Sequence, residues 1–273
     1  MRAGPYVGSY RRRSAGVLWQ NLSALACRHM DDTSPDLRSE HGPVTVTVLD
    51  GVAIIDIDDG KANALGFAVL DGLDAALDRA SEDDIAAVAV IGREGKFSAG
   101  FDLSVMTSGP AAARDMLGRG AEIGLRLVAF PKPVVFGVTG HALAMGAILL
   151  CCADVRIGAD GPFKIGLNEV AIGMPVPAFA VEVCRARLSV PAFNRAVQLA
   201  HIHSPAEAHA AGFLDEVVDA GQVRDRAIAV AAELGERLHA GPFRVTRRTV
   251  RGEMADALHT ELVESLSNFA VSD

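Results

Sequence analysis

The chain contains 273 residues, half of them hydrophobic, with 34 acidic residues against 26 basic ones and a formal net charge of −8. This length is sufficient to bury a hydrophobic core without disulfides or a structural metal. The acidic balance argues against nucleic acid as a partner, because phosphate binding requires clustered lysine and arginine. The four cysteines are too few and too unevenly spaced for a disulfide framework. We therefore expect a reduced, cytoplasmic protein.

Residues 1–42 differ in composition from the rest of the chain. Three arginines at positions 11–13 precede a stretch, 14–27, in which polar residues interrupt the apolar ones. A signal peptide requires a cleaner apolar segment and a small-residue cleavage site. We expect an N-terminal extension that is either disordered or misannotated, with Met30 as an alternative start.

The remaining chain alternates predicted strands with predicted helices for about 150 residues, as judged from apolar periodicity and turn residues. In chain order, the predicted elements are strands at 44–48 and 52–57, a helix at 65–80, a strand at 86–91, an irregular glycine-rich loop at 92–102, a helix at 111–130, a strand at 133–139, a buried helix at 145–153, and short strands at 155–157 and 163–165. The chain after Val176 is predicted to be mostly helical. Such alternation favours an α/β fold with covered sheets.

Residues 133–153 contain no Asp, Glu, Lys or Arg, and this run is long enough to span a bilayer. Its several glycines and the ionisable His141 in its middle make a membrane helix unfavourable. A strand, a glycine turn and a buried helix fit the run better, so we expect no membrane association. A helix that begins near Met145 would present unpaired N–H groups, which can stabilise an oxyanion.

Several segments are informative as a set, because they occur together and in a fixed order. They are 59–65 (DGKANAL), 96–103 (KFSAGFDL), 140–146 (GHALAMG), 166–173 (GLNEVAIG), 204–208 (SPAEA) and 211–213 (AGF). With these segments, the chain resembles the crotonase (enoyl-CoA hydratase/isomerase) superfamily over roughly residues 43–250. The resemblance implies a core of repeated ββα units at 43–200 and a helical oligomerisation region at 201–273. It also implies a homotrimer or a dimer of trimers, acyl-CoA thioester substrates and a role in fatty-acid metabolism.

The resemblance also implies catalytic residues. The two oxyanion-hole donors of the family fall on the backbone N–H groups of Phe101 and Met145, and the proton-transferring carboxylate falls on Glu169. Two backbone donors would stabilise the enolate that forms when a proton leaves C2 of the thioester, and losing one such donor typically costs about 3–4 kcal/mol of barrier. No cofactor is implied, because coenzyme A is part of the substrate.

Contacts to coenzyme A are implied near the start of the core and on the last helix. By resemblance, they fall at Lys61, Ala62, Ala99, Phe101 and Arg247. The last of these lies in a basic stretch for which a solvated face is the usual interpretation. A cation that meets the phosphates of coenzyme A is the alternative for Arg247.

One departure from the family pattern bears on the reaction. Hydratases of the family use two glutamates, and the first of them aligns with Ile148 here, whereas the second matches Glu169. The isomerase branch needs one base, which removes a proton from C2 and returns it at C4. The dienoyl-isomerase branch carries an acid at the position of Pro177. We therefore expect a Δ3,Δ2-enoyl-CoA isomerase, with enoyl-CoA hydratase (a lyase) and a non-catalytic CoA-ester binding protein as alternatives.

Other polar residues have simpler interpretations. Asp102 and Asp154 are expected to make hydrogen bonds at loops and helix ends. His141 is expected to be a packed or pocket-wall histidine, with a general base as the alternative. Glu122 could replace the missing acid only if the fold brings it into the site. His201-Ile202-His203 lacks the spacing of further metal ligands, so we expect these histidines to be exposed and predict no metal site.

Overall fold

The computed structural model describes residues 42–267, so the predicted extension at 1–42 lies almost entirely outside the described residues. In chain order the elements are β1 (Val44–Leu49), β2 (Val52–Ile57), β3 (Ala64–Leu65), α2 (Phe67–Ala80), β4 (Ala87–Gly92), β5 (Gly95–Ser98), β6 (Gly100–Phe101), α3 (Leu103–Met106), α4 (Pro110–Ala129), β7 (Val134–Val138), β8 (Gly140–Leu143), α5 (Met145–Cys152), β9 (Val155–Ala159), β10 (Ile165–Gly166), η1 (Val170–Ile172), α6 (Ala178–Arg187), α7 (Val190–Val197), α8 (Pro205–Ala211), β11 (Glu216–Val218), η2 (Ala220–Gln222), α9 (Val223–Arg237) and α10 (Ala240–Ser267).

Within residues 42–267, six strands form one sheet in the order β1-β2-β4-β7-β9-β11. Strands β1 and β2 form the predicted antiparallel hairpin, in which Val44 lies opposite Ile57. The remaining neighbours are parallel, as the crossing helices require, with Ile54 opposite Ala89 in the β2–β4 pair. Strand β4 is buried along its whole length, which agrees with its continuous apolar sequence.

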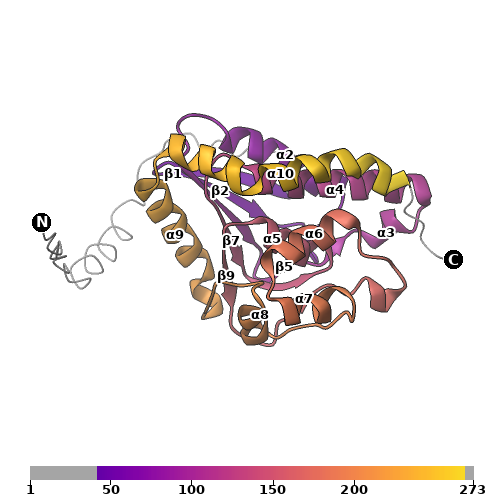
Figure 1. The fold of residues 1–273 in the computed structure, drawn as a ribbon. Helices are drawn as coiled ribbons and strands as arrows, with labels where there is room; N and C mark the ends of the chain where they lie inside the picture. The colour runs from indigo at the N-terminus through magenta and orange to yellow at the C-terminus, as the bar shows by residue number, and fades with distance from the viewer. Residues whose placement is uncertain (1–41, 268–273) are drawn as a thin grey trace, which may run out of the picture. The chain divides into compact units, whose positions relative to one another are not determined.

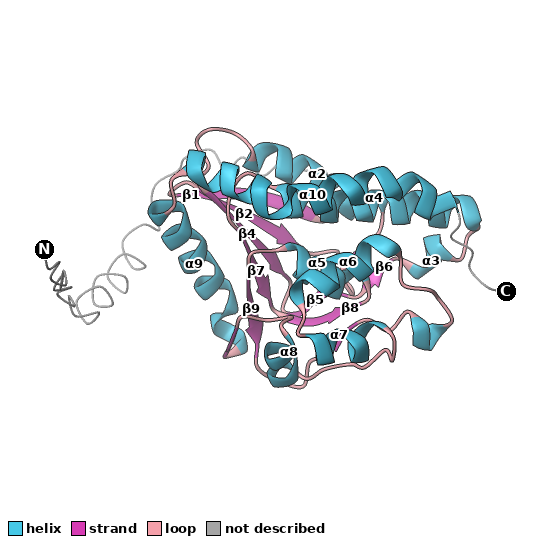
Figure 2. Cartoon of the chain, in the orientation of Figure 1, coloured by secondary structure: helices cyan, strands magenta, loops and turns pink. Residues whose placement is uncertain are grey.

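Helices cover both faces of this sheet (Figure 1). Helix α9 packs against β4, β7 and β9 on one face, where Ala227 and Ala231 join a small apolar cluster with residues of the strands. The opposite face carries the larger core, to which α2, α4, α5 and α6 contribute. In Figure 2, α9 lies on one side of the magenta strands, and α5 and α6 lie on the other. The α/β fold expected from the sequence is thus confirmed.

Two smaller sheets lie beside the main one and carry the segments of the family pattern. They have the strand orders β10-β8-β5 and β3-β6 within the described chain. The region predicted as an irregular loop, 92–102, therefore contains strands β5 and β6, and the predicted glycine turn contains β8. These strands have two to four residues, which is too short for a periodic pattern to be visible in the sequence.

The uncharged run 133–153 forms β7, β8 and α5, so the strand and the buried helix predicted there are present, and every residue of α5 is buried. Among the described residues, no helix combines the length and the apolar character that crossing a membrane demands. Residues 177–267 are mostly helical, as predicted. They also supply β11, which pairs with β9 and extends the main sheet.

Candidate active site

A cavity of about 160 Å³ lies between β6, α3, α4, α5 and α6. Most of its walls are apolar side chains, as is usual for a small-molecule site. Asn168 and Glu169 are the two residues with polar side chains on this cavity in the described part of the chain. The lining residues are Ala99, Phe101, Leu103, Met106, Leu117, Ala144, Met145, Ile148, Asn168, Glu169, Ile172, Met174, Pro175, Pro177 and Phe179.

Glu169 lies where the chain leaves β10 and enters the short helix η1. Its backbone carbonyl accepts hydrogen bonds from the N–H groups of Ile172 (3.0 Å) and Met174 (2.9 Å), which fix the turn. The side chain is 6% exposed, and its Oε2 has no hydrogen-bond partner within residues 42–267. Burial in this apolar surrounding raises the pKa of Glu169 to about 7, because the charged form loses its hydration. A buried carboxylate with a free oxygen and a near-neutral pKa suits proton transfer.

Two residues from different elements, Phe101 and Met145, line the same cavity as this carboxylate, and their backbone amides are the predicted oxyanion donors. Phe101 ends the short strand β6, and its neighbour Asp102 donates its N–H to Leu65 of β3 at 3.4 Å. In a parallel ladder adjacent residues direct their N–H groups to opposite sides, so the N–H of Phe101 faces away from β3. A Cβ atom placed on Gly100 would lie only 3.3 Å from the amide nitrogen of Met145. Strand β6 and the start of α5 are therefore in direct contact.

The start of α5 has an unusual backbone. Ala144 precedes the helix with φ +49° and ψ −125°, and its carbonyl accepts from the N–H groups of Ala147 and Ile148. Met145 is the first helical residue, so its N–H has no acceptor within the helix. Gly146 allows the helix to approach β5, since a Cβ there would lie 2.7 Å from the carbonyl oxygen of Ser98. The first turn of α5 contributes Met145 and Ile148 to the lining of the cavity.

The position of the missing second glutamate is occupied by an apolar wall. Ile148 is 2% exposed and lines the cavity one turn into α5. Pro177, at the position where the dienoyl-isomerase branch has an acid, also lines it. Glu122 is on the exposed side of α4 and is not part of the lining, so the structure does not bring it into the site. Glu169 is thus the one titratable side chain on this cavity in the described chain.

The residues predicted to contact coenzyme A are partly brought together. Ala99 lines the cavity and donates its N–H to the carbonyl of Ala62 at 3.1 Å, which places the loop of Lys61 and Ala62 beside it. Lys61 is exposed, and its carbonyl accepts hydrogen bonds from Arg93 (2.6 Å) and Lys96 (3.1 Å). The three basic residues of this region, Lys61, Arg93 and Lys96, are not part of the cavity lining.

Arg247 is not brought to the cavity. Its side chain is buried, with an ion pair to Asp154 at 2.6 Å and a hydrogen bond to the carbonyl of Val128 at 3.2 Å. The solvated basic face expected here is therefore wrong for Arg247, because α10 packs this side chain against α4. Arg248 of the same stretch is exposed and pairs with Asp256.

The structure also shows the surroundings of Asp102 and of the histidines that the sequence analysis considered. Asp102 caps α3 by accepting from the N–H of Ser104 at 2.8 Å, as expected of a helix-end acid. His141 accepts from the N–H of Lys164 at 2.9 Å and stays outside the cavity lining. His203 is buried, so the expectation of an exposed histidine is wrong there. No group of three potential metal ligands occurs among the described residues.

Sequence reasoning missed most of the cavity wall. The apolar side chains come from the neighbouring helices α3 and α4 and from α6, which is distant in the chain, and nothing in their local pattern distinguishes them from core residues. These wall residues are Leu103, Met106, Leu117 and Phe179. Asn168 was also missed, although its position next to Glu169 is a visible signal.

Comparison with known proteins agrees with this geometry. Residues 47–270 match the family model described as enoyl-CoA hydratase/isomerase. The chain belongs to this family, the crotonase superfamily. As a member, it is an enzyme of acyl-CoA metabolism.

Named relatives in the family carry two different activities. The mouse protein "Enoyl-CoA delta isomerase 1, mitochondrial" is 30% identical over 80% of this chain and 77% of its own. The apo structure of an enoyl-CoA isomerase from Mycobacterium tuberculosis superposes with a TM-score of 0.79 at 40% identity, covering 83% of this chain and 99% of that one. An enoyl-CoA hydratase from Mycobacterium marinum has the same TM-score, 0.79, and 40% identity, with 84% and 100% covered. The choice between these reactions depends on the residues of the cavity.

Proposed function

We propose that this crotonase-family enzyme is a Δ3,Δ2-enoyl-CoA isomerase in which Glu169 carries the proton. The observation that supports this most directly is the composition of the cavity wall. Glu169 is its one titratable side chain in the described chain, and Ile148 stands where a second glutamate would be needed to activate water.

The reaction requires one base and one anion-stabilising site. The thioester oxygen of a 3-enoyl-CoA would accept hydrogen bonds from the backbone N–H groups of Phe101 and Met145. Glu169 would then remove a proton from C2, so that the electron pair of the C–H bond moves into a dienolate stabilised by the two amides. The same carboxyl group would return the proton to C4, which leaves the double bond between C2 and C3. Atoms and charge balance without water or a second acid.

The environment of Glu169 favours this shuttle. A pKa of about 7 makes the carboxylate a stronger base than an ordinary glutamate while keeping a substantial part ionised at neutral pH. The apolar neighbours that raise it also limit water in the cavity. Exclusion of water opposes hydration, which is the competing reaction.

Coenzyme A would lie across the mouth of the cavity, with Lys61, Ala62 and Ala99 along its path. Ala99 is exposed at the lining and is hydrogen-bonded to Ala62, which supports this placement. Arg247 is engaged by Asp154, so its predicted contact with a phosphate would require that ion pair to open.

The proposal is tested by supplying purified protein with a 3-enoyl-CoA and, separately, with the 2-enoyl-CoA, and following both products. We expect conversion of the 3-enoyl thioester to the 2-enoyl thioester and slow or absent hydration. Glu169→Gln should lower kcat by about 10³-fold or more, the upper range for losing a general base, while acyl-CoA binding survives.

Glu122→Gln is the matched control, because it makes the same change on the exposed side of α4. It should leave the isomerase rate unchanged. Rapid hydration of the 2-enoyl thioester by the wild type would support the hydratase alternative and contradict the isomerase. Tight binding with no turnover of either thioester would support the non-catalytic alternative.

A further inference from the structure

The C-terminal end of α5 is buried, and its own donors are weak thiols, of which Cys152 donates to the carbonyl of Ile148 at 3.6 Å. The helix reads Met-Gly-Ala-Ile-Leu-Leu-Cys-Cys, all of its residues are buried, and Ala153 follows as its C-cap. The carbonyl groups of the last four residues of a helix accept no hydrogen bond from within the helix. Burying them without other donors costs free energy of folding. Donors for this end must come from elsewhere in the fold.

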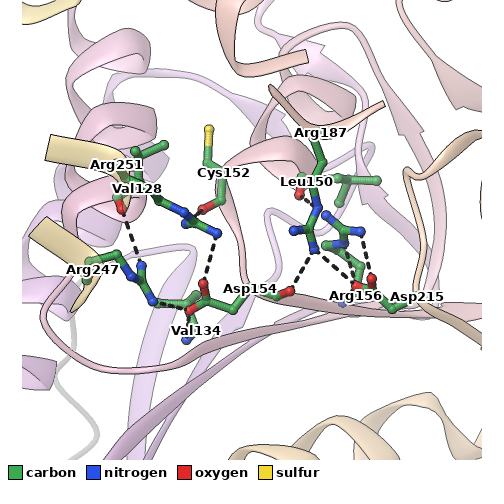
Figure 3. Close-up of polar contacts among 10 residues, drawn as sticks. All are labelled: Val128, Val134, Leu150, Cys152, Asp154, Arg156, Arg187, Asp215, Arg247 and Arg251. Atoms are coloured by element: carbon green, nitrogen blue, oxygen red, sulfur yellow. Dashed lines mark hydrogen bonds and ion pairs between the residues drawn. The ribbon is translucent and has the colours of Figure 1, made fainter. Parts of the chain in front are cut away.

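Two arginines from different elements supply them. Arg156 of β9 is 1% exposed and donates to the carbonyl of Leu150 at 3.3 Å. Arg251 of α10 donates to the carbonyl of Cys152 at 3.4 Å. The two guanidinium groups approach this end of the helix from separate sides (Figure 3). Cations at a helix C-terminus also interact favourably with its dipole.

Two aspartates hold these arginines in place. Asp215 pairs with Arg156 at 2.8 Å, and Asp154 pairs with Arg251 at 3.1 Å (Figure 3). Asp154 itself lies two residues after α5, and its backbone carbonyl accepts from Arg187 at 2.7 Å. The end of α5 is therefore tied to β9, α6 and α10 at once.

The network has a surplus of positive charge. Four arginines share the two aspartates, so the network carries a formal charge of +2, and each guanidinium pairs with one of the carboxylates and also donates to a backbone carbonyl. The four are Arg156, Arg187, Arg247 and Arg251. This surplus is the arrangement expected where arginines serve as helix-end donors rather than as ion pairs alone.

The N-terminal end of α5 carries the Met145 amide, and this end is tightly packed. A helix of this length measures about 12 Å at 1.5 Å per residue and moves as a rigid unit. Its first turn packs against Gly100 and Ser98 at distances that would not admit even one additional carbon atom. A shift of the helix at its C-terminal end would consequently move the Met145 N–H relative to Phe101.

We propose that Arg156 and Arg251 are positioning residues for the oxyanion site, acting through α5. They fix the axial position of the helix and thereby the direction of the Met145 N–H. This inference rests on the proposed role of that N–H in binding the thioester oxygen.

Arg251 is the better residue to test, because it lies at the edge of the network and is less buried than Arg156. Arg251→Leu should lower kcat for 3-enoyl-CoA about tenfold or more with KM changed less than about twofold, since a misdirected donor affects the transition state most. Arg251→Lys keeps a cation beside Asp154 but replaces the planar guanidinium and its several N–H donors by one ammonium group. It should keep the thermal stability of the wild type but not recover its kcat.

Arg226→Leu is the matched control. It removes another arginine of a C-terminal helix, one that pairs with Glu216 at 2.9 Å and contacts neither α5 nor the cavity. We expect a stability loss similar to that of Arg251→Leu and an unchanged kcat. Equal kcat values for the two leucine variants would overturn the inference.

A spectroscopic measurement separates this inference from the proposed function. 4-(Dimethylamino)cinnamoyl-CoA absorbs at longer wavelength when its thioester carbonyl is polarised by hydrogen bonds. The red shift on binding should be smaller in Arg251→Leu and Arg251→Lys than in the wild type, and unaltered in Arg226→Leu. An undiminished shift in the Arg251 variants would refute the positioning role, even if the wild type is an isomerase. A diminished shift would support it, even if the wild type does not turn over 3-enoyl-CoA.

Discussion

At the scale of the residue, Glu169 combines a buried carboxylate with a pKa of about 7, which has a kinetic consequence. Only the ionised form can accept the C2 proton, so kcat/KM for 3-enoyl-CoA should rise with pH and level off above about pH 7. Two pH units below that midpoint the ionised fraction falls to roughly one hundredth, and the rate should fall with it. Steady-state rates measured across this range provide the check. A flat profile from about pH 5 upwards, as for an ordinary glutamate, would contradict a raised pKa at the catalytic base.

Residue positions were predictable from the sequence where a motif fixes them locally. Glu169 lies within a short family segment and Ile148 lies two residues after another, and both line the cavity as the family pattern implies. Arg247 shows the opposite case. Its partner Asp154 is 93 residues away in the chain, and no pattern within α10 indicates that the helix buries this arginine. A contact between two residues so far apart in the chain is seen only in the folded structure.

At the scale of the element, helix α4 controls the shape of the cavity through one glycine. A Cβ atom on Gly120 would lie 2.4 Å from the ring of Phe101, so Gly120→Ala must push this ring, which lines the cavity, from its place. We expect kcat/KM for long-chain 3-enoyl-CoA to fall about tenfold relative to short-chain substrate, with an overpacking cost of about 1–3 kcal/mol in stability. Rates with a series of acyl lengths test this. An unchanged chain-length profile would show that the ring does not limit the acyl group.

Gly241→Ala provides the matched control for this experiment. Gly241 also lies in a helix, α10, and a Cβ there would meet nothing within 4 Å. Removing a helical glycine at an open position should leave the chain-length profile intact and change stability by less than about 1 kcal/mol.

Long helices and strands were predicted from the sequence more accurately than short strands. Helices α2 and α4 and strand β4 carry long periodic or continuous apolar patterns, and their predicted limits agree with the structure within three residues. Strands β5, β6 and β8 are short and rich in glycine, so their region resembled a loop. These strands form because neighbouring chain segments pair with them, as in the β5–β8 contact. That tertiary pairing is absent from local sequence.

At the scale of the whole molecule, the fold assembles the site from segments that are distant in sequence. Strand β6, helix α5 and the turn at Glu169 meet on one side of the main sheet, and α4 and α6 complete the cavity. Assembly at this point leaves a carboxylate in apolar surroundings. The site is thus built at a cost to the stability of the folded chain, and that cost depends on pH.

Glu169→Gln should reveal this cost in the free energy of unfolding. The carboxyl group has an ordinary pKa near 4.5 when exposed and about 7 in the folded chain. Between these values the unfolded chain has released its proton and the folded chain still holds it, so the wild type loses stability as pH rises through this window. Above about pH 7 the full penalty, about 3 kcal/mol, is present. The glutamine variant lacks it and should be more stable by roughly that amount at pH 8, with no difference at pH 4. Urea unfolding at both values measures this, and a variant that is less stable at pH 8 would show that the ionised carboxylate is well solvated.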